Sequence, residues 1–205
     1  MMEHRLDILV ILTAFFLRNV SASHFRGAII TWKPGASQNE VIIDYRISWR
    51  MTYSDSFTCD DNTIQTGETI GGEGTIDCFD NCAGSLGSLR YQCTDYSTNE
   101  DWSSGKGRIT ATLTSSYSPY TYYNYYRSSV FHFGFAGQAW INTLVVGSGG
   151  SWQLKTTADL TYRSDIGRIN SSPRAEVSPI VRLQRGCNHT VIIPGKHNHF
   201  EFKVL

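Results

Sequence analysis

The sequence predicts an all-β protein: an antiparallel β-sandwich with a disulfide-stapled long loop insertion, preceded by a signal peptide. Three observations predict this fold. Residues 41–50 alternate strictly between apolar and polar, and several other short segments rich in β-branched and aromatic residues are separated by Gly, Ser or Pro clusters. No window after the first residues shows apolar residues at helical spacing, so we expect two packed antiparallel sheets and no helix in the mature chain.

The first residues predict export from the cell. Residues 1–5 carry a basic start that ends at Arg5, and residues 6–17 are almost wholly apolar, a run shorter than the roughly 18 residues that cross a bilayer. Small residues at 20–22 favour cleavage after Ala22, and a short uncleaved anchor is the alternative. We expect a signal peptide at 1–22, the β-sandwich module at 23–185, and at 186–205 the truncated start of a following β unit or an irregular tail. No later segment is apolar enough to span a membrane.

Segment 41–50 predicts a half-buried strand, because every second residue is apolar. A turn-rich stretch at 34–39 joins it to segment 25–32, which is also rich in strand-forming residues. Further strands are expected at 108–114, 129–136, 139–146, 152–162, 180–184 and 189–193. We interpret the tryptophans in these segments as core residues: Trp32, Trp49, Trp140 and Trp152.

The five cysteines predict two disulfides and one odd thiol. Four of them, Cys59, Cys78, Cys82 and Cys93, lie in a Gly-rich stretch that we interpret as a loop insertion between strands. Of the three connectivities we favour the nested one, Cys59 with Cys93 and Cys78 with Cys82, because such a loop needs covalent staples. Zinc binding is disfavoured by the spacing and by the absence of a nearby histidine. Cys187 is expected to be unpaired or to pair with another chain.

Two sequons predict N-glycosylation at exposed positions, at Asn170 and at Asn188. Acidic residues between Asp60 and Asp80 alternate with glycines, and oxygen ligands on such a loop suit Ca²⁺. No spacing matches a defined calcium loop, so we expect solvated charge, no metal site and no cofactor, with Ca²⁺ as the alternative. His24 would lie next to the mature amino terminus, where an amine and an imidazole chelate copper, but it also begins the first expected strand.

The Tyr-rich segment 115–129 is the clearest candidate for ligand contact. Exposed tyrosines offer a rigid apolar ring with a polar tip, which suits stacking on a sugar or contact with a protein. The alternative is a β-hairpin with Pro119 in its turn, in which the tyrosines divide between core and surface. The candidate contact residues are Tyr120, Tyr122, Tyr123, Tyr125 and Tyr126.

Composition and motifs favour binding over catalysis. The formal net charge is zero, which gives no electrostatic reason to bind nucleic acid or anionic lipid. The sequence lacks a nucleophile elbow, a zinc-protease helix and a phosphate-binding loop. We therefore expect a secreted, extracellular module that binds protein or glycan partners in recognition, adhesion or matrix assembly and is not an enzyme. The alternatives are a lectin-like carbohydrate-binding module and, less favoured, a secreted hydrolase.

Two signatures resemble a known kind of module. They are Ser-His-Phe-Arg-Gly at 23–27 with Ile-Thr-Trp at 30–32, and Gly-Cys-Asn-His-Thr at 186–190 with Ile-Ile-Pro at 192–194. Both resemble the amino-terminal β-rich module of large mosaic extracellular proteins of invertebrates. The resemblance implies that an immunoglobulin- or cadherin-like unit follows, often with EGF-type repeats, and it implies no catalytic residues. Residues 195–205 depart from it, because small and acidic residues leading to another cysteine would be expected there.

Overall fold

The computed structural model describes residues 24–114, 129–138, 140–141, 144–175 and 181–195, and the backbone of 196 and 201–204. The expected signal peptide at 1–22 and the tyrosines of segment 115–128 lie outside these residues. Within the described ranges, no helix has the length and apolar character that a bilayer crossing requires.

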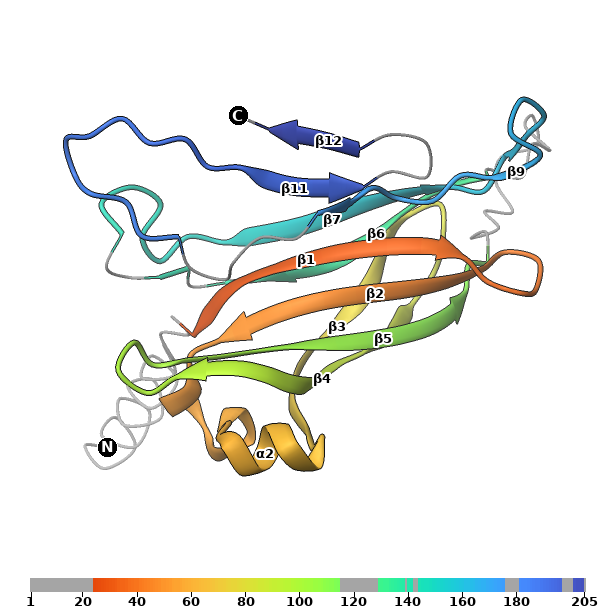
Figure 1. Cartoon of the computed structure of the whole chain (residues 1–205). Helices are drawn as coiled ribbons and strands as arrows, with labels where there is room; N and C mark the ends of the chain where they lie inside the picture. The colour runs from red at the N-terminus through yellow and green to blue at the C-terminus, as the bar shows by residue number, and fades with distance from the viewer. Residues whose placement is uncertain are drawn as a thin grey trace, which may run out of the picture.

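Seven strands form one antiparallel sheet in the order β1-β2-β5-β4-β3-β6-β7 (Figure 1). A two-stranded and a three-stranded sheet, β8-β9 and β10-β11-β12, follow in the sequence. The large sheet consists of β1 (Phe25–Pro34), β2 (Glu40–Trp49), β3 (Thr69–Asp80), β4 (Ser85–Ser97), β5 (Trp102–Thr112), β6 (Val130–Gly137) and β7 (Trp152–Asp159). The smaller sheets consist of β8 (Tyr162–Arg163), β9 (Arg168–Ile169), β10 (Arg174–Ala175), β11 (Ile193–Lys196) and β12 (Glu201–Val204). Thus β11 pairs with β10 across the boundary that we placed between residues 185 and 186.

The sheet curls until its two edge strands, β1 and β7, meet through side chains. The indole Nε1 of Trp32 on β1 donates to the carbonyl of Thr157 on β7 at 2.8 Å. The ring of Phe25 stacks on Trp152 with centroids 3.9 Å apart. The all-β antiparallel prediction is confirmed, but the sandwich is not: one twisted sheet encloses the core by nearly closing into a barrel, so no second sheet has to pack against it.

Beyond β9, the chain covers part of the free edge of β1. The Trp32 amide donates to Ser172 Oγ at 2.7 Å, and the Ser172 amide donates back to the Trp32 carbonyl at 3.0 Å. The Ser172 hydroxyl also donates to this carbonyl, at 3.2 Å. These bonds satisfy backbone groups that an edge strand otherwise exposes.

The core is apolar and aromatic, as the alternation in segment 41–50 predicted. The five apolar residues at alternate positions from Val41 to Trp49 are all buried. Buried phenylalanines of β1 and β6 pack against them: Phe25, Phe131, Phe133 and Phe135. The interpretation of the tryptophans as core residues is confirmed, since Trp32 and Trp49 are buried and Trp140 and Trp152 pack against the core.

The predicted loop insertion is wrong, because residues 59–93 contain β3 and most of β4 in the interior of the sheet. The glycines that suggested a loop belong to an irregular strand, in which the pairing with β4 shifts between Gly71 and Thr75. Gly71 and Gly74 have φ of 81° and 87°, which L side chains rarely adopt. A Cβ on Gly74 would also lie 2.3 Å from the Phe135 ring. Glycine is therefore needed here for a bulge and for close packing.

A short helix, α2 (Asp61–Thr66), contradicts the prediction that the mature chain has none. Its six residues are too few to show a periodic apolar face in the sequence, so only the capping residues could have indicated the helix. Asp60 accepts from the Thr63 amide at its start, and Gly67 has φ of 69° at its end. Two 3-10 turns, η1 (Met51–Tyr53) and η2 (Asp55–Phe57), precede it.

Three expected strands are wrong within the described residues. The described parts of 139–146 and 180–184 form no strand, and Ile193 alone of segment 189–193 belongs to one. Several of these apolar side chains are exposed, including Val145 and Val146. A short apolar run becomes a strand when a partner pairs with it, and periodicity does not reveal that partner.

The sulfurs lie in the nested arrangement that we favoured. Cys59 and Cys93 are joined at 1.96 Å, and Cys78 and Cys82 at 2.04 Å. The first bond ties the chain just before α2 to the middle of β4, and both of its cysteines are buried. The second ties the end of β3 to the turn that follows it.

We predict that loss of Cys59–Cys93 destabilises the protein more than loss of Cys78–Cys82. The two disulfides close loops with sequence separations of 34 and 4 residues. Loop-closure entropy then gives about 4 kcal/mol for the first and about 2 kcal/mol for the second. Urea unfolding of the two double alanine variants measures both values. Equal losses, or a larger loss for Cys78→Ala/Cys82→Ala, would contradict the role of the long loop.

We also predict that Ser172→Ala lowers the free energy of unfolding by roughly 1–2 kcal/mol, because the Trp32 amide loses its acceptor. Because Ser172 also belongs to the Asn170 sequon, all variants should be produced in a host that does not N-glycosylate, so that a lost sugar cannot change the measured stability. The matched control is Ser172→Thr, which keeps the hydroxyl and should stay close to the parent. Equal stability of the alanine and threonine variants would show that the hydroxyl does not support this edge.

Candidate ligand-binding pocket

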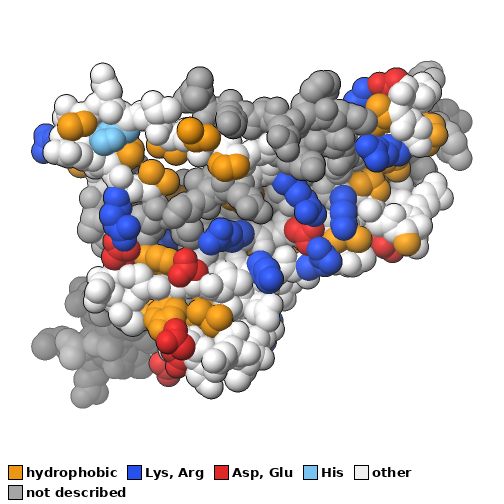
Figure 2. Space-filling model, in the orientation of Figure 1, with side chains coloured by type: hydrophobic (Ala, Val, Ile, Leu, Met, Phe, Trp, Pro, Cys, Tyr) orange, Lys and Arg blue, Asp and Glu red, His pale blue; other side chains and the backbone are white. Residues whose placement is uncertain are grey.

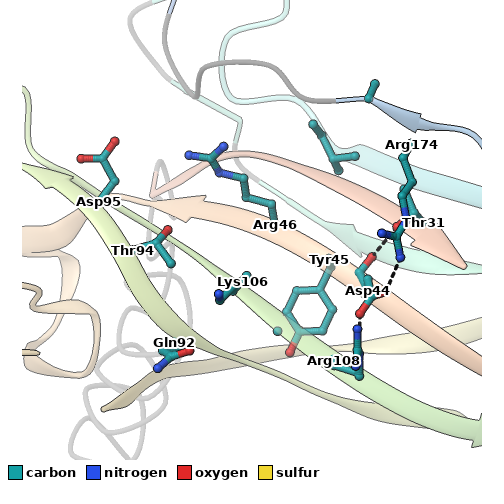
Figure 3. A pocket seen from close by; sticks show the side chains of 13 residues that line it. Thr31, Asp44, Tyr45, Arg46, Gln92, Thr94, Asp95, Lys106, Arg108 and Arg174 are labelled. Atoms are coloured by element: carbon teal, nitrogen blue, oxygen red, sulfur yellow. Dashed lines mark hydrogen bonds and ion pairs between the residues drawn. The ribbon is translucent and has the colours of Figure 1, made fainter. Parts of the chain in front are cut away.

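A pocket of about 850 Å³ lies on the face of the sheet opposite the core, over β1, β2, β5 and β4 (Figure 3). Four basic and two acidic residues line it, together with threonine and glutamine side chains. The charged residues are Asp44, Arg46, Asp95, Lys106, Arg108 and Arg174. The pocket lining therefore carries more positive than negative charge.

Strand alternation and register place these residues. Asp44 and Arg46 lie on the face of β2 opposite the buried Ile43, Tyr45 and Ile47. In the pairing of β2 with β5, Asp44 is opposite Arg108 and Arg46 is opposite Lys106. Two neighbouring rows of side chains thus cross the sheet: a first row with Asp44 and Arg108, and a second row with Arg46 and Lys106.

Asp44 organises the first row. Its Oδ1 accepts from Arg108 Nε at 2.5 Å, and its Oδ2 lies 3.2 Å from Arg174 Nη2. The hydrogen bond and the negative charge of Asp44 raise the pKa of Arg108. One carboxylate therefore holds two guanidinium groups from distant parts of the chain.

Arg174 reaches this row because of the bonds at the β1 edge. Ser172 is fixed to Trp32, and two residues later the chain enters β10, where Arg174 pairs with Lys196 of β11. Figure 3 shows Arg174 and Arg108 on opposite sides of Asp44.

Tyr45 lies between the two rows in Figure 3, with its ring packed over Gly107 on the core side of the sheet. A Cβ on Gly107 would lie 2.2 Å from the ring, so glycine is required at that position. The Tyr45 hydroxyl donates to the carbonyl of Arg90. Burial raises the pKa of Tyr45, while this hydrogen bond acts in the opposite direction.

The residues that we predicted as sites lie elsewhere or outside the described chain. Tyr120, Tyr122, Tyr123, Tyr125 and Tyr126 are outside it. Asn188 is exposed, as its sequon predicted, whereas Asn170 is half-buried and its Oδ1 has no hydrogen-bond partner among the described residues. Cys187 is exposed and forms no disulfide within the same ranges. Glycosylation of either asparagine stays a prediction.

The acidic residues of the Gly-rich stretch separate into local contacts. Asp60 caps α2, Asp61 accepts from the Tyr96 hydroxyl at 3.1 Å, and Asp77 accepts from Thr75 Oγ1 at 2.9 Å. In the described part of the chain, no three His, Cys, Asp or Glu side chains converge on a position that suits a metal ion. Calcium binding by this stretch stays a hypothesis.

His24 is buried in an aromatic cluster. Its ring stacks on Tyr53 and Trp49, with centroids 3.7 Å and 5.0 Å away, and its Nε2 lies 2.9 Å from Glu73 Oε1. His132 extends from β6 to Thr157 Oγ1 at 3.0 Å. These contacts give both histidines packing and hydrogen-bonding roles. The amine of the copper hypothesis lies outside the described residues.

The pocket residues were not predicted as a site. The alternation in segment 41–50 assigns Asp44 and Arg46 to a polar face, and the spacing of Lys106 and Arg108 is also two. What the sequence does not show is that β2 pairs with β5, since Asp44 and Arg108 are 64 residues apart.

Residues 26–161 match the family described as Integrin beta-like protein A-E, N-terminal. The chain belongs to this family. The match to the integrin beta-like family contains β2 to β7 and all of β1 except Phe25, and so includes the strands beneath the pocket, while Arg174 lies beyond it.

The chain is also similar to Integrin beta-like protein C of Dictyostelium discoideum, with 24% identity over 197 residues. This alignment covers 96% of the chain and 9% of that protein, so the chain spans a small part of its relative's length. No solved structure gives a significant match. The comparisons do not confirm the resemblance to mosaic proteins of invertebrates. The family match and the expected resemblance agree on one point, since both concern an amino-terminal module.

We predict that Asp44→Asn lowers the free energy of unfolding by up to about 1 kcal/mol, because two guanidinium groups lose their shared carboxylate. Added salt should recover part of the loss by screening the remaining cations. The matched control is Asp165→Asn, which breaks the exposed pair with Arg163 and should change stability little. Urea midpoints at low and high salt measure both effects, and equal shifts in the two variants would contradict the organising role of Asp44.

Proposed function

We propose that this chain is an extracellular adhesion module that binds its partner through the pocket on β1, β2, β5 and β4. The match of residues 26–161 to the integrin beta-like amino-terminal family carries the proposal, because that family is named after the β chains of adhesion receptors. The two disulfides support an oxidising, extracellular location. The apolar leader with its small-residue cleavage pattern supports export, with the mature chain beginning at Ser23.

The pocket supports binding as the role of the module. Its volume of about 850 Å³ lies within the range of ligand sites, and its rim is open to solvent. Its lining combines charged side chains with hydroxyl and amide groups, which orient a partner through hydrogen bonds. We assign no chemical step to these side chains, and the partner in this proposal is a protein or glycan outside the cell.

The proposal predicts that cells attach to surfaces coated with the secreted, disulfide-bonded protein several times better than to surfaces coated with albumin. Thr94→Trp should reduce attachment strongly, because a bulky ring enters the pocket that Thr94 lines. The matched control is Thr110→Trp, on an exposed position of β5 outside the pocket lining. Counting attached cells after a fixed wash gives the measurement.

Attachment equal to that on albumin, or equal losses for the two tryptophan variants, would refute adhesion through this pocket. Retention of the chain inside the producing cell with residues 1–22 still attached would refute the extracellular assignment. Mass spectrometry of protein from the medium tests this second point.

A further inference from the structure

Two like charges face each other across the sheet next to the Asp44 row. Arg46 and Lys106 are direct partners in the pairing of β2 with β5, and both line the pocket. Facing side chains in an antiparallel pair have Cβ atoms roughly 5 Å apart, so two cations there repel each other. Figure 2 shows Lys and Arg side chains gathered across the middle of this side of the molecule.

The two rows differ in how their charges are compensated. In the first row, Asp44 binds both Arg108 and Arg174. In the second row, no salt bridge or side-chain hydrogen bond joins Arg46 or Lys106 to another described residue. The second row therefore carries excess positive charge inside a pocket.

Arg46 also has a buried donor without an acceptor. Its Nε is inaccessible to solvent and has no hydrogen-bond partner among the described residues, although the side chain as a whole is half-buried. A guanidinium presents its donors in a planar fork that fits the oxygens of a carboxylate or a sulfate. The terminal nitrogens of Arg46 are not among the buried atoms, so an oxyanion that enters the pocket would pair with them and offset the repulsion from Lys106.

The surrounding side chains suit a ligand that also carries hydroxyl groups. Gln92 of β4 is opposite Lys106, and Thr94 and Asp95 follow on the same strand within the lining. Asp95 would repel a second anionic group, whereas a sugar hydroxyl donates to a carboxylate. Figure 3 shows Thr94, Asp95, Arg46 and Lys106 on the same side of Tyr45.

The shape of the site favours a glycan over an extended peptide. β2, β5 and β4, which carry Arg46, Lys106 and the neighbouring polar residues, are each paired on both sides in the sheet, so a peptide backbone cannot add to the strands beneath this part of the pocket. The volume of about 850 Å³ is sufficient for a short run of sugar rings.

We propose that Arg46 and Lys106 bind the carboxylate or sulfate group of an acidic glycan, while Gln92, Thr94 and Asp95 contact its hydroxyls. This inference rests on the proposed adhesion function and names the class of ligand that its pocket takes.

The test is calorimetric titration of the full secreted chain with defined probes. Tetragalacturonate supplies carboxylates alone, and a heparin-derived tetrasaccharide supplies sulfates together with carboxylates. Fully methyl-esterified tetragalacturonate is the uncharged control. Tetraglutamate tests an acidic peptide. The variant is Arg46→Gln/Lys106→Gln, and the control, Lys155→Gln/Arg185→Gln, removes the same charge from exposed positions outside the pocket lining.

We expect at least one acidic glycan to bind and the esterified probe to fail. The Arg46→Gln/Lys106→Gln variant should bind roughly ten- to hundredfold more weakly, because two charge-assisted contacts are lost. Its thermal midpoint should be equal to or higher than that of the parent, since a repulsive pair is removed. The control variant should bind like the parent. Binding of tetragalacturonate would assign recognition of carboxylates, and binding of the heparin-derived probe alone would assign recognition of sulfates.

Three results would overturn the inference: no binding of either acidic glycan, equal binding of the esterified probe, or equal weakening by the control variant. Tetraglutamate binding as strong as glycan binding, with the same dependence on Arg46 and Lys106, would replace the glycan with an acidic peptide. If cells attach to the coated protein while no acidic glycan binds, this inference fails and the adhesion role stands.

Discussion

The indole of Trp32 joins the first and last strands of the large sheet, and the rest of the fold is arranged around that closure. Its Nε1 bond to Thr157 brings β1 to β7, so a single sheet encloses the aromatic core. The backbone amide and carbonyl of Trp32 bond to Ser172 and so fix the chain that leads to Arg174. Burial of apolar surface drives the curling, and these few directed bonds determine which residues meet at the seam.

The same strands serve two purposes because their side chains alternate. On β2, Ile43, Tyr45 and Ile47 fill the core, while Asp44 and Arg46 reach the pocket. Rigid pairing across β1, β2, β5 and β4 holds the charged groups at fixed spacing without relying on mobile loops. A surface built in this way is preorganised, so the strands beneath the pocket would lose little conformational entropy on binding a partner.

Sequence patterns correctly predicted features that depend on neighbouring residues, such as a single amphipathic strand. The alternation in segment 41–50 predicted β2 and its buried face. The predicted export signal and the clustered cysteines indicated two disulfides; their nested pairing agrees with the structure, although we favoured it for a loop that is in fact β3 and β4. The glycines around Gly74 were misinterpreted as a loop, because a bulge packed under Phe135 leaves the same local signature. The pocket depends on pairing between residues 64 positions apart, such as Asp44 and Arg108, and no local pattern encodes that register.

Closure at Ser172 also sets an order of events for the sequon at Asn170. The hydroxyl that completes this sequon is engaged by the Trp32 backbone in the folded chain, and the Asn170 amide oxygen is buried. An oligosaccharyltransferase needs both groups accessible, so any sugar at Asn170 of a secreted chain would have to be attached before the seam forms. The fraction of secreted chains that carry a sugar at Asn170 would then report how quickly the nascent domain folds.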